Sequence, residues 1–410
     1  MKRKISFAFI FIFAICSSCV FGADTSSLDI SSPACIMVEE TTNTIIYEKN
    51  SNSKMYPAST TKILTALLTL EKGNLGDVVT ISHSAIEDLK GGYITPYISE
   101  GEELTVEQLL NVLLVPSGNV AGNALAEYVS GSTQNFANLM NTRAKELGCT
   151  NSHFTNSYGK HDDNHYTSAH DLYLITKAAM KYDIFRQIVS QTSYTLPATN
   201  KHSKNDRILT STNDLIKPSS SVYYEGAIGI KTGFTTPAKD CLVAAATKNN
   251  MTFYVVILGA DKNKSNVSYR YIDCKKLFDF AFKNYAFRTI ISKDFVVKTI
   301  EIQGATSSTK KLDLIADSKI SALITNADTY TSFIPTITIN ELSAPINKGE
   351  IVGSITYEID GKTYTANLLA GSDVKKSYMF ILVDIFIAIA ILIIIRIIFF
   401  KKKRIKKYRI

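Results

Sequence analysis

The segment YPASTTKILTALLTLEKG, residues 56–73, joins a chemically suggestive turn to the start of a helix. Its second part has apolar residues at helical spacing and ends at a glycine, which predicts a helix. Pro57 precedes this pattern, so we expect Ser59 at the helix N-terminus and Lys62 one turn later. Residues three apart share a helix face, so the Lys62 amine can reach the Ser59 hydroxyl and take its proton. Because a serine and lysine at this spacing are common by chance, the pair needs companions elsewhere in the chain.

Two further motifs follow in the chain. Ser117-Gly118-Asn119 comes after the helical pattern TVEQLLNVLLVP, and Lys231-Thr232-Gly233 ends the strand pattern GAIGI. A Ser-x-x-Lys motif with Ser-Asp-Asn and Lys-Thr-Gly motifs is typical of penicillin-binding proteins and class A β-lactamases. All three motifs stand here in that order, with glycine as the middle residue of the second, so together they predict an active site.

The similarity extends beyond the motif residues. The stretches LLVPSGNVAGNALAEYV and GIKTGFTTPAKDCLVAAA resemble the low-molecular-weight penicillin-binding proteins that act as D-alanyl-D-alanine carboxypeptidases. This resemblance covers about Ala34 to Ala286, and the segment behind it is similar to the family's second domain. It implies an α+β fold of the β-lactamase/penicillin-binding transpeptidase-like class, an antiparallel sheet with helices. It also implies an enzyme that acts on peptidoglycan stem peptides, is inhibited covalently by β-lactam antibiotics, and needs no cofactor.

The resemblance assigns roles in acyl transfer to four side chains. Ser59 is the nucleophile that attacks the carbonyl between two D-alanines, and Lys62 is the expected base. A base must be neutral, and the nearby positive charge of Lys231 would lower the pKa of the Lys62 amine. Ser117 is expected to relay a proton to the leaving nitrogen. Asn119 is expected to hold the substrate amide and to orient Lys62.

The remaining site residues are expected to bind the substrate. The family pattern places the oxyanion between the backbone N–H groups of Ser59 and Phe234. Lys231-Thr232-Gly233 would meet the terminal carboxylate, a contact that distinguishes an exopeptidase from an endopeptidase. Arg270, in SYRY before DCKKLF, aligns with a family arginine that aids this contact; the alternative is an arginine with only a surface role.

The loop GKHDDNH, residues 159–165, contains two histidines and two aspartates, side chains that can bind a metal. Its spacing fits no closed zinc set, and we expect a hydrogen-bonded wall near the mouth of the active site instead. Asp171 is expected to be an acidic residue in the first turn of a helix.

The pattern of the chain predicts five segments. Residues 1–23, with a basic start and an apolar run, predict a signal peptide. Residues 24–286 mix strands and helices and form the expected catalytic domain. Residues 287–374 alternate as short strands, with Asp360-Gly361 as a hairpin signal, and predict a small β-rich domain that positions the catalytic one. Residues 378–400 are long and apolar enough to cross a membrane. The basic tail 401–410 is expected in the cytoplasm and the body outside.

The distribution of charge along the chain and the positions of the cysteines limit which functions the protein can have. Ten of the 45 basic residues lie at the two ends, which leaves 35 against 37 acidic residues, so nothing indicates nucleic-acid binding. Cys19 is a weak match to a lipidation site within the predicted signal. The other cysteines of the body, Cys35, Cys149, Cys241 and Cys274, lie in or beside apolar runs and are expected to be buried free thiols, although two disulfides are formally possible.

Three alternatives share some of these features. A class A β-lactamase needs a glutamate to activate water, and FTNSY, residues 154–158, offers no carboxylate. A peptidoglycan endopeptidase or transpeptidase would use the same three motifs. An inactive, membrane-anchored module that binds the cell wall is disfavoured because Ser59, Lys62, Ser117, Asn119 and Lys231 are all intact.

Overall fold

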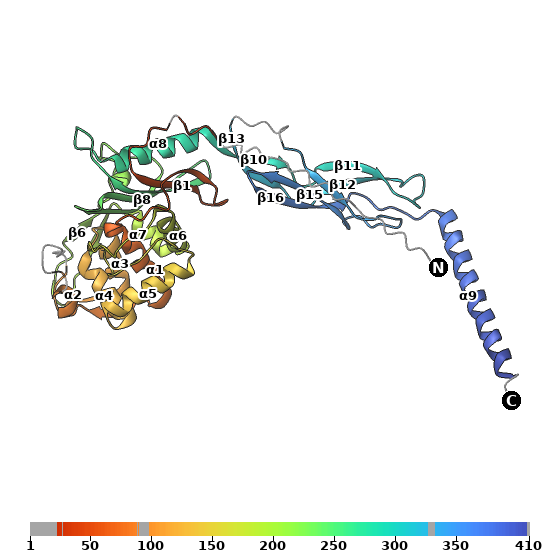
Figure 1. Cartoon of the computed structure of the whole chain (residues 1–410), viewed down its shortest axis with the longest axis horizontal. Helices are drawn as coiled ribbons and strands as arrows, with labels where there is room; N and C mark the ends of the chain where they lie inside the picture. The colour runs from red at the N-terminus through yellow and green to blue at the C-terminus, as the bar shows by residue number, and fades with distance from the viewer. Residues whose placement is uncertain (1–22, 27, 88, 90–97, 327–332, 408–410) are drawn as a thin grey trace, which may run out of the picture. The chain divides into compact units, whose positions relative to one another are not determined.

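The computed structural model describes residues 23–26, 28–87, 89, 98–326 and 333–407 (Figure 1). The predicted signal peptide, with Cys19, lies almost wholly outside the described residues. Two compact units are present, one from Ala23 to Tyr285 and one from Ala286 to the C-terminus. The three motifs all lie in the first unit.

The first unit is built on a five-stranded antiparallel sheet. Its strands, in spatial order, are β2 (Ile45–Lys49), β1 (Ala34–Glu39), β9 (Met251–Ala260), β8 (Lys239–Lys248) and β7 (Ala227–Thr235). β1 pairs with β9, so the N-terminal hairpin completes a sheet whose other strands come some 190 residues later. The antiparallel sheet agrees with the expected fold class, and the pairing shows that distant parts of the chain build it.

Helices cover both faces of this sheet. α8 (Tyr269–Asn284) packs on β8 and β9, whereas α6 (Ala169–Ala179) packs on β1 and β9 from the other side (Figure 1). The helices that gather with α6 are α1 (Lys62–Lys72), α3 (Val106–Leu114), α4 (Asn119–Ser130) and α5 (Thr133–Glu146). Their buried aliphatic side chains form one hydrophobic core with the sheet. α1 and α3 confirm the two helical patterns described in the sequence, KILTALLTLEKG and TVEQLLNVLLVP.

Local chemistry sets the ends of these helices. Thr105 and Gln108 form a capping box at the start of α3, in which each side chain accepts from the other residue's backbone N–H. Ser168 caps α6, and Asp171 lies in the first turn as predicted, buried and accepting from the backbone N–H of Asn151 at 2.7 Å. These caps fix where the loops carrying the motifs leave the helices.

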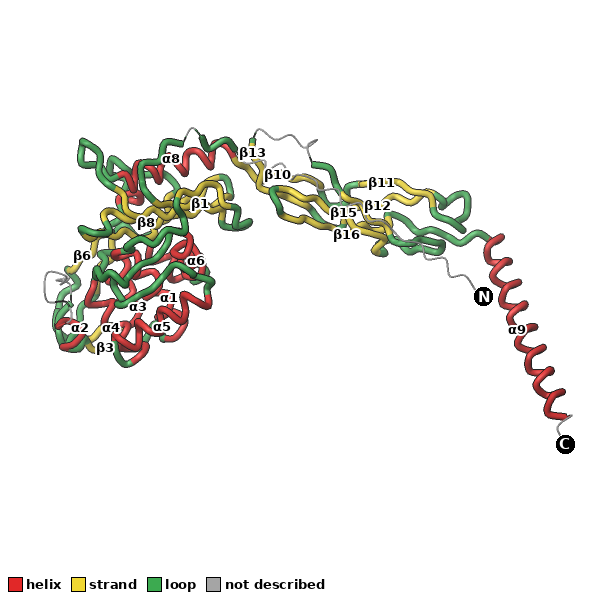
Figure 2. Tube along the Cα trace, in the orientation of Figure 1, coloured by secondary structure: helices red, strands yellow, loops and turns green. Residues whose placement is uncertain are grey.

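Smaller elements complete the first unit (Figure 2). They are α2 (His83–Glu87), α7 (Asp183–Val189), the pair β3 (Val78–Thr80) with β4 (Glu103–Thr105), and the hairpin β5 (Ser193–Leu196) with β6 (Arg207–Thr210). The hairpin is tied down by Arg207, which forms an ion pair of 2.7 Å with the buried carboxylate of Glu102. The segment that follows β6 therefore begins at a fixed position.

The second unit contains two antiparallel sheets and a long helix. The larger sheet has the order β11 (Val296–Glu301), β12 (Lys311–Ala316), β16 (Lys362–Ala370), β15 (Ile351–Ile359) and β14 (Thr336–Ile339). The smaller pairs β10 (Tyr285–Ile291) with β13 (Ile320–Thr325). Asp360 and Gly361, with φ of 50° and 70°, turn β15 into β16 as the sequence predicted. α9 (Tyr378–Lys407) follows and is long and apolar enough to cross a membrane.

The four cysteines of the described chain are free thiols. Cys35, Cys241 and Cys274 are fully buried, and Cys149 is partly so. Burial raises the pKa of the Cys35 thiol to about 12, so this group remains protonated and behaves as a small apolar side chain.

Candidate active site

The turn that carries Ser59 is a short 3₁₀ segment, Ala58–Thr61, that runs directly into α1 at Lys62. The Lys62 Nζ atom lies 3.0 Å from the Ser59 Oγ atom, within hydrogen-bond distance. Ser59 is half-buried, whereas Lys62 is completely buried. The structure therefore brings the amine to the hydroxyl as the three-residue spacing predicted.

Two other oxygens surround the Lys62 amine. Nζ lies 2.7 Å from Asn119 Oδ1 and 2.7 Å from the backbone oxygen of Tyr158. Both oxygens can only accept hydrogen bonds, so they take the two hydrogens of a neutral amine. Its lone pair is then left for the O–H of Ser59. This arrangement suits a base that removes the hydroxyl proton.

The electrostatic environment favours the neutral amine. Burial, and to a lesser extent the positive charge of Lys231, hold the pKa of Lys62 well below its usual value. Lys231 is itself buried at 1% exposure, on strand β7, and burial together with the Arg270 guanidinium lowers its pKa to about 7. An anion bound beside Lys231 would favour its charged form and raise that pKa.

Strand β7 lies against the turn that carries Ser59. A Cβ added at Gly233 would lie 3.0 Å from the Ser59 nitrogen and 2.9 Å from the Pro57 oxygen, so only glycine allows this approach. Phe234 follows, with its side chain 61% exposed. The backbone of β7 thus runs beside the backbone N–H of Ser59, where the sequence analysis expected the oxyanion.

Gly159 closes the other side of the same turn. Its φ is +92°, and an added Cβ would lie 1.8 Å from the backbone oxygen of Ala58. A side chain at position 159 would therefore collide with the backbone of Ala58. The loop that carries Gly159 and the turn that carries Ser59 would have to move apart.

We therefore expect Gly159→Ala to lower the rate of acylation of Ser59 at least about 10-fold and to lower the melting temperature by several degrees. Gly131→Ala is the matched control, because Gly131 has φ +78° with nothing within 4 Å of its added Cβ. Thermal unfolding and labelling by a fluorescent penicillin measure both effects. Equal losses in the two variants would show that backbone strain alone, and not the close approach to Ala58, accounts for the effect.

Arg270, in the first turn of α8, points toward β7. One guanidinium nitrogen, Nη1, donates to the Gly233 backbone oxygen at 3.2 Å and lies 3.0 Å from the carboxylate of Asp240. Both side chains are largely buried, at 15% and 7% exposure. Asp240, which pairs across the sheet with Phe234, thus fixes Arg270 beside the third motif. No local pattern in the sequence indicates Asp240, because this contact joins residues about 30 positions apart, on β8 and α8.

Ser117 occupies a left-handed backbone position, with φ of 67°. Gly118 follows it closely, and its N–H donates to the Val112 oxygen at 2.8 Å. Within the described chain the Ser117 hydroxyl has no hydrogen-bond partner, so it is available to a substrate. Asn119, two residues on, touches Lys62, which places this loop at the same site.

The histidine-containing loop contributes one side chain to the back of the site. His165 is buried, and its Nδ1 atom accepts from the Thr155 N–H at 3.0 Å, so Nε2 carries the proton and donates to the Thr61 hydroxyl at 2.8 Å. Burial lowers the pKa of His165 to about 3, so the ring stays neutral. His161 stacks edge-on against Tyr56 at 4.7 Å between centroids. These contacts agree with a hydrogen-bonded wall. Among the described residues no cluster of three potential metal ligands occurs.

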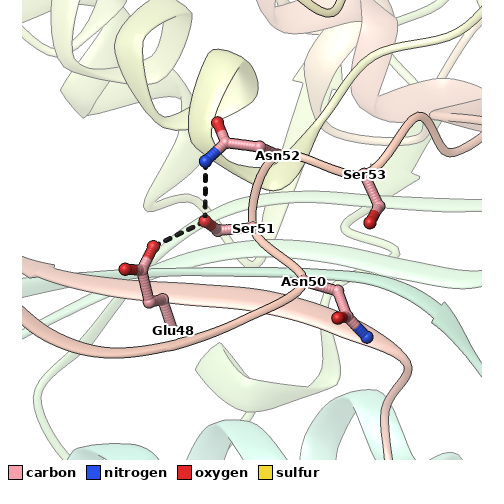
Figure 3. Close-up of a pocket in the computed structure, with 5 residues that line it drawn as sticks. All are labelled: Glu48, Asn50, Ser51, Asn52 and Ser53. Atoms are coloured by element: carbon pink, nitrogen blue, oxygen red, sulfur yellow. Dashed lines mark hydrogen bonds between the residues drawn. The ribbon is translucent and has the colours of Figure 1, made fainter.

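A separate polar hollow lies in the loop after β2 (Figure 3). It is lined by Glu48 and residues 50–53, and Ser51 donates to Glu48 at 2.6 Å. None of the motif residues lines it, so it is not part of the site described above.

A buried lysine with a lowered pKa beside a serine hydroxyl, with a second serine and a Lys-Thr-Gly strand around them, defines a serine acyl-transfer enzyme. The family model described as D-alanyl-D-alanine carboxypeptidase, Peptidase_S11, matches residues 22–262, and the model of the penicillin-binding protein 5 C-terminal domain matches residues 285–376. The chain belongs to the D-alanyl-D-alanine carboxypeptidase family, the low-molecular-weight penicillin-binding proteins, and is a serine-type carboxypeptidase.

Individual relatives agree with this family. The D-alanyl-D-alanine carboxypeptidase DacF of Bacillus subtilis is 33% identical over 364 residues, which cover 87% of this chain and 89% of the relative. The structure of penicillin-binding protein 5 from Haemophilus influenzae is 25% identical, with a TM-score of 0.61, and the match covers 85% of this chain and 98% of that one. A mutant DD-transpeptidase from Streptomyces K15 is 31% identical, with a TM-score of 0.57, over 62% of this chain and 98% of that one.

Proposed function

We propose that this enzyme removes the terminal D-alanine from peptidoglycan stem pentapeptides through an acyl-enzyme on Ser59. The observation that carries this proposal is the 3.0 Å contact between the Ser59 hydroxyl and a fully buried lysine amine. Lys62 takes the hydroxyl proton as the Ser59 oxygen attacks the carbonyl of the penultimate D-alanine. The oxygens of Asn119 and Tyr158 accept the two hydrogens of the amine, so its lone pair stays directed toward the Ser59 hydroxyl during this step.

The negative oxygen that forms on the attacked carbonyl needs preorganised donors. The backbone N–H groups of Ser59 and Phe234 are the proposed pair, and the close packing of Gly233 on the Ser59 turn supports it. Loss of one such donor costs about 2.7–4 kcal/mol of transition-state stabilisation. Because the donors belong to the backbone, they need not reorganise during the reaction.

Release of D-alanine requires a proton on its nitrogen. Ser117, whose hydroxyl has no partner within the described chain, is proposed to pass this proton from Lys62 to the leaving amine. Asn119 holds Lys62 and is placed to bind the substrate amide. Water then attacks the carbonyl of the acyl-enzyme while Lys62 accepts a proton from it. The bond between this carbonyl and Ser59 Oγ breaks, and Lys62 returns the proton to Oγ, which restores the free serine.

The terminal carboxylate of the substrate is proposed to bind at Lys231, Thr232 and Gly233, with Arg270 behind them. Lys231 is buried and Arg270, which is paired with Asp240, is largely so, and an anion bound here would favour the charged form of Lys231. This requirement for a free carboxylate favours a carboxypeptidase over an endopeptidase, whose substrates continue beyond the cleaved bond.

The experiment that tests the function treats the purified full-length enzyme with fluorescent penicillin and maps the labelled peptide. We expect a stable adduct on Ser59, and release of D-alanine from a pentapeptide by unlabelled enzyme. Rapid turnover of the label would identify a β-lactamase instead. The chain between Thr155 and Tyr158 offers no carboxylate, and Asn156 there is engaged with the backbone N–H groups of Gly159 and Lys160, at 2.8 and 2.9 Å. No label on folded enzyme would indicate an inactive module.

We further propose that the enzyme is exported by residues 1–23 and anchored by residues 378–400, with the tail 401–410 in the cytoplasm and the catalytic domain, residues 24–286, outside. The β-rich domain, residues 287–374, would act as a spacer between catalytic domain and membrane. Trimming of stem peptides at the membrane surface would give the enzyme a role in cell-wall biogenesis and cell shape.

This topology predicts different access to two engineered cysteines. In intact cells, an impermeant thiol reagent is expected to label Ser308→Cys, which is exposed in the second unit, but to label Tyr408→Cys only after permeabilisation. The unmodified chain corrects for the native thiols, and among the described residues these are buried or partly buried. Labelling of Tyr408→Cys in intact cells would reverse the proposed orientation.

A further inference from the structure

A threonine outside the three motifs lies beside the third of them. Thr212, two residues after strand β6, has an exposed side chain whose Oγ1 atom lies 2.6 Å from Oγ1 of Thr232. Thr232 itself is 5% exposed. The Thr212 hydroxyl therefore lies on the solvent side of a motif residue that is otherwise buried.

The backbone of Thr212 is fixed from two other parts of the site. Its N–H donates to the oxygen of Val115, just before the Ser117 loop, at 3.2 Å. Its own oxygen accepts from the Tyr271 hydroxyl at 3.4 Å, and this hydroxyl accepts from Arg270 at 3.2 Å. These contacts hold Thr212 between the Ser117 loop, strand β7 and helix α8.

The hydroxyl pair has one hydrogen to spare. Two threonine hydroxyls carry two hydrogens, and only one of them is used in the bond between the two oxygens. The other can be donated to a third group. Lys231 precedes Thr232 on strand β7, and the Arg270 guanidinium, paired with Asp240, donates to the oxygen of Gly233. An anion bound here would favour the charged form of Lys231 and accept a charge-assisted hydrogen bond, so an anion is the group that best accepts this hydrogen.

We propose that Thr212 is a further substrate-binding residue, whose hydroxyl, paired with that of Thr232, completes the site for the terminal carboxylate of the peptide. This inference rests on the proposed function, since it assigns a new residue to the same substrate. It predicts that Thr212 contributes to the choice of a free carboxylate over an uncharged terminus.

A residue that only held the loop in place would behave differently. Loss of its hydroxyl would lower thermal stability and would affect all substrates to the same extent. Loss of a contact to the carboxylate raises KM only for peptides that end in a carboxylate, while kcat changes little.

The test compares Thr212→Val with wild type on a peptide ending in D-Ala-D-Ala and on the same peptide with a C-terminal amide. A hydrogen bond to a charged group corresponds to roughly a 10-fold change or more. We expect Thr212→Val to raise KM for the acid about 10-fold, to leave kcat within about 2-fold, and to leave kcat/KM for the amide unchanged. Thr212→Ser, which keeps the hydroxyl, should restore KM for the acid.

Thr252→Val is the matched control. Thr252 forms a similar hydroxyl pair, 2.8 Å from Thr247, at the opposite end of β8 and β9. Thr247 stands six residues along β8 from Cys241, which pairs with Gly233, a distance of about 20 Å. We expect this variant to match wild type on both peptides.

The outcomes separate the two proposals. An inactive wild type would refute the proposed function itself. An active wild type with equal losses on acid and amide in Thr212→Val, or with no loss on either, would overturn the role of Thr212. If Thr212→Val does not fold, Thr212→Ala removes the same hydroxyl with a smaller side chain and is judged by the same ratio.

Discussion

Ser59→Ala is expected to abolish penicillin labelling and to lower the rate of D-alanine release at least about 10⁴-fold, because Ser59 is the proposed nucleophile and Lys62 has no other serine hydroxyl within hydrogen-bond distance in the described chain. The melting temperature should stay close to that of wild type, since the Ser59 side chain is half-buried and only its Oγ atom is lost. The measurements are label incorporation, D-alanine release from a pentapeptide, and thermal unfolding.

Ser53→Ala is the control for this substitution, because Ser53 lies six residues upstream and is exposed. It should label and turn over like wild type. Persistent turnover by folded Ser59→Ala would remove Ser59 from the role of nucleophile, and the label would then have to be mapped to another side chain.

The amino-acid sequence alone predicts the central chemistry of this enzyme because that chemistry is encoded locally. Ser59 and Lys62 lie within one turn, so helical geometry brings them together without any long-range contact. Ser117 and Lys231 were found only because each belongs to a short motif of fixed composition. The helices α1 and α3 and the strand β7 were likewise predicted from patterns within single segments.

Other features depend on contacts between distant segments, which no local pattern reveals. Asp240 matters because the fold places it against Arg270, and Tyr158 matters through its backbone oxygen, which any residue could supply. Thr212 is one of many threonines until β6 and β7 bring it to Thr232. The hairpin β5–β6 was missed for the same reason, since the ion pair that holds Arg207 reaches back to Glu102.

The histidine-containing loop shows how burial decides between chemical roles. From its sequence this loop contains four potential ligands, and the spacing and the resemblance to the family argued against a metal. In the structure His165 points into the core and supports Thr61, next to Lys62, while His161 packs on Tyr56. The types of side chain in a loop therefore do not show whether it binds a metal until the direction of each side chain is known.

Lys62→Arg is the second substitution with a large expected effect. Arginine keeps a positive charge and hydrogen-bond donors but cannot be deprotonated in a protein, so it cannot take the Ser59 proton. General-base catalysis contributes about 10²–10⁴-fold, and we expect a loss of acylation at the upper end of that range, measured by stopped-flow labelling with penicillin. Lys72→Arg, on the exposed last turn of the same helix, should acylate like wild type.

Because of Lys62, both the rate of acylation and the stability of the fold should rise as the pH is raised. Burial and Lys231 lower the pKa of Lys62, so the neutral, active amine forms as pH rises through that lowered value, and acylation by wild type should rise with it. Between this pKa and the ordinary value near 10.5, the unfolded chain binds one more proton at this site than the folded chain does. Stability contributed by this site therefore increases with pH.

Comparison with Lys62→Met isolates this contribution, because methionine fills a similar volume and does not titrate. The melting temperature of wild type minus that of Lys62→Met should grow as pH is raised from 7 toward 10. The variant should be inactive at every pH. A difference that stayed constant with pH would mean that Lys62 is charged in the folded enzyme, and a charged Lys62 could not be the base that activates Ser59.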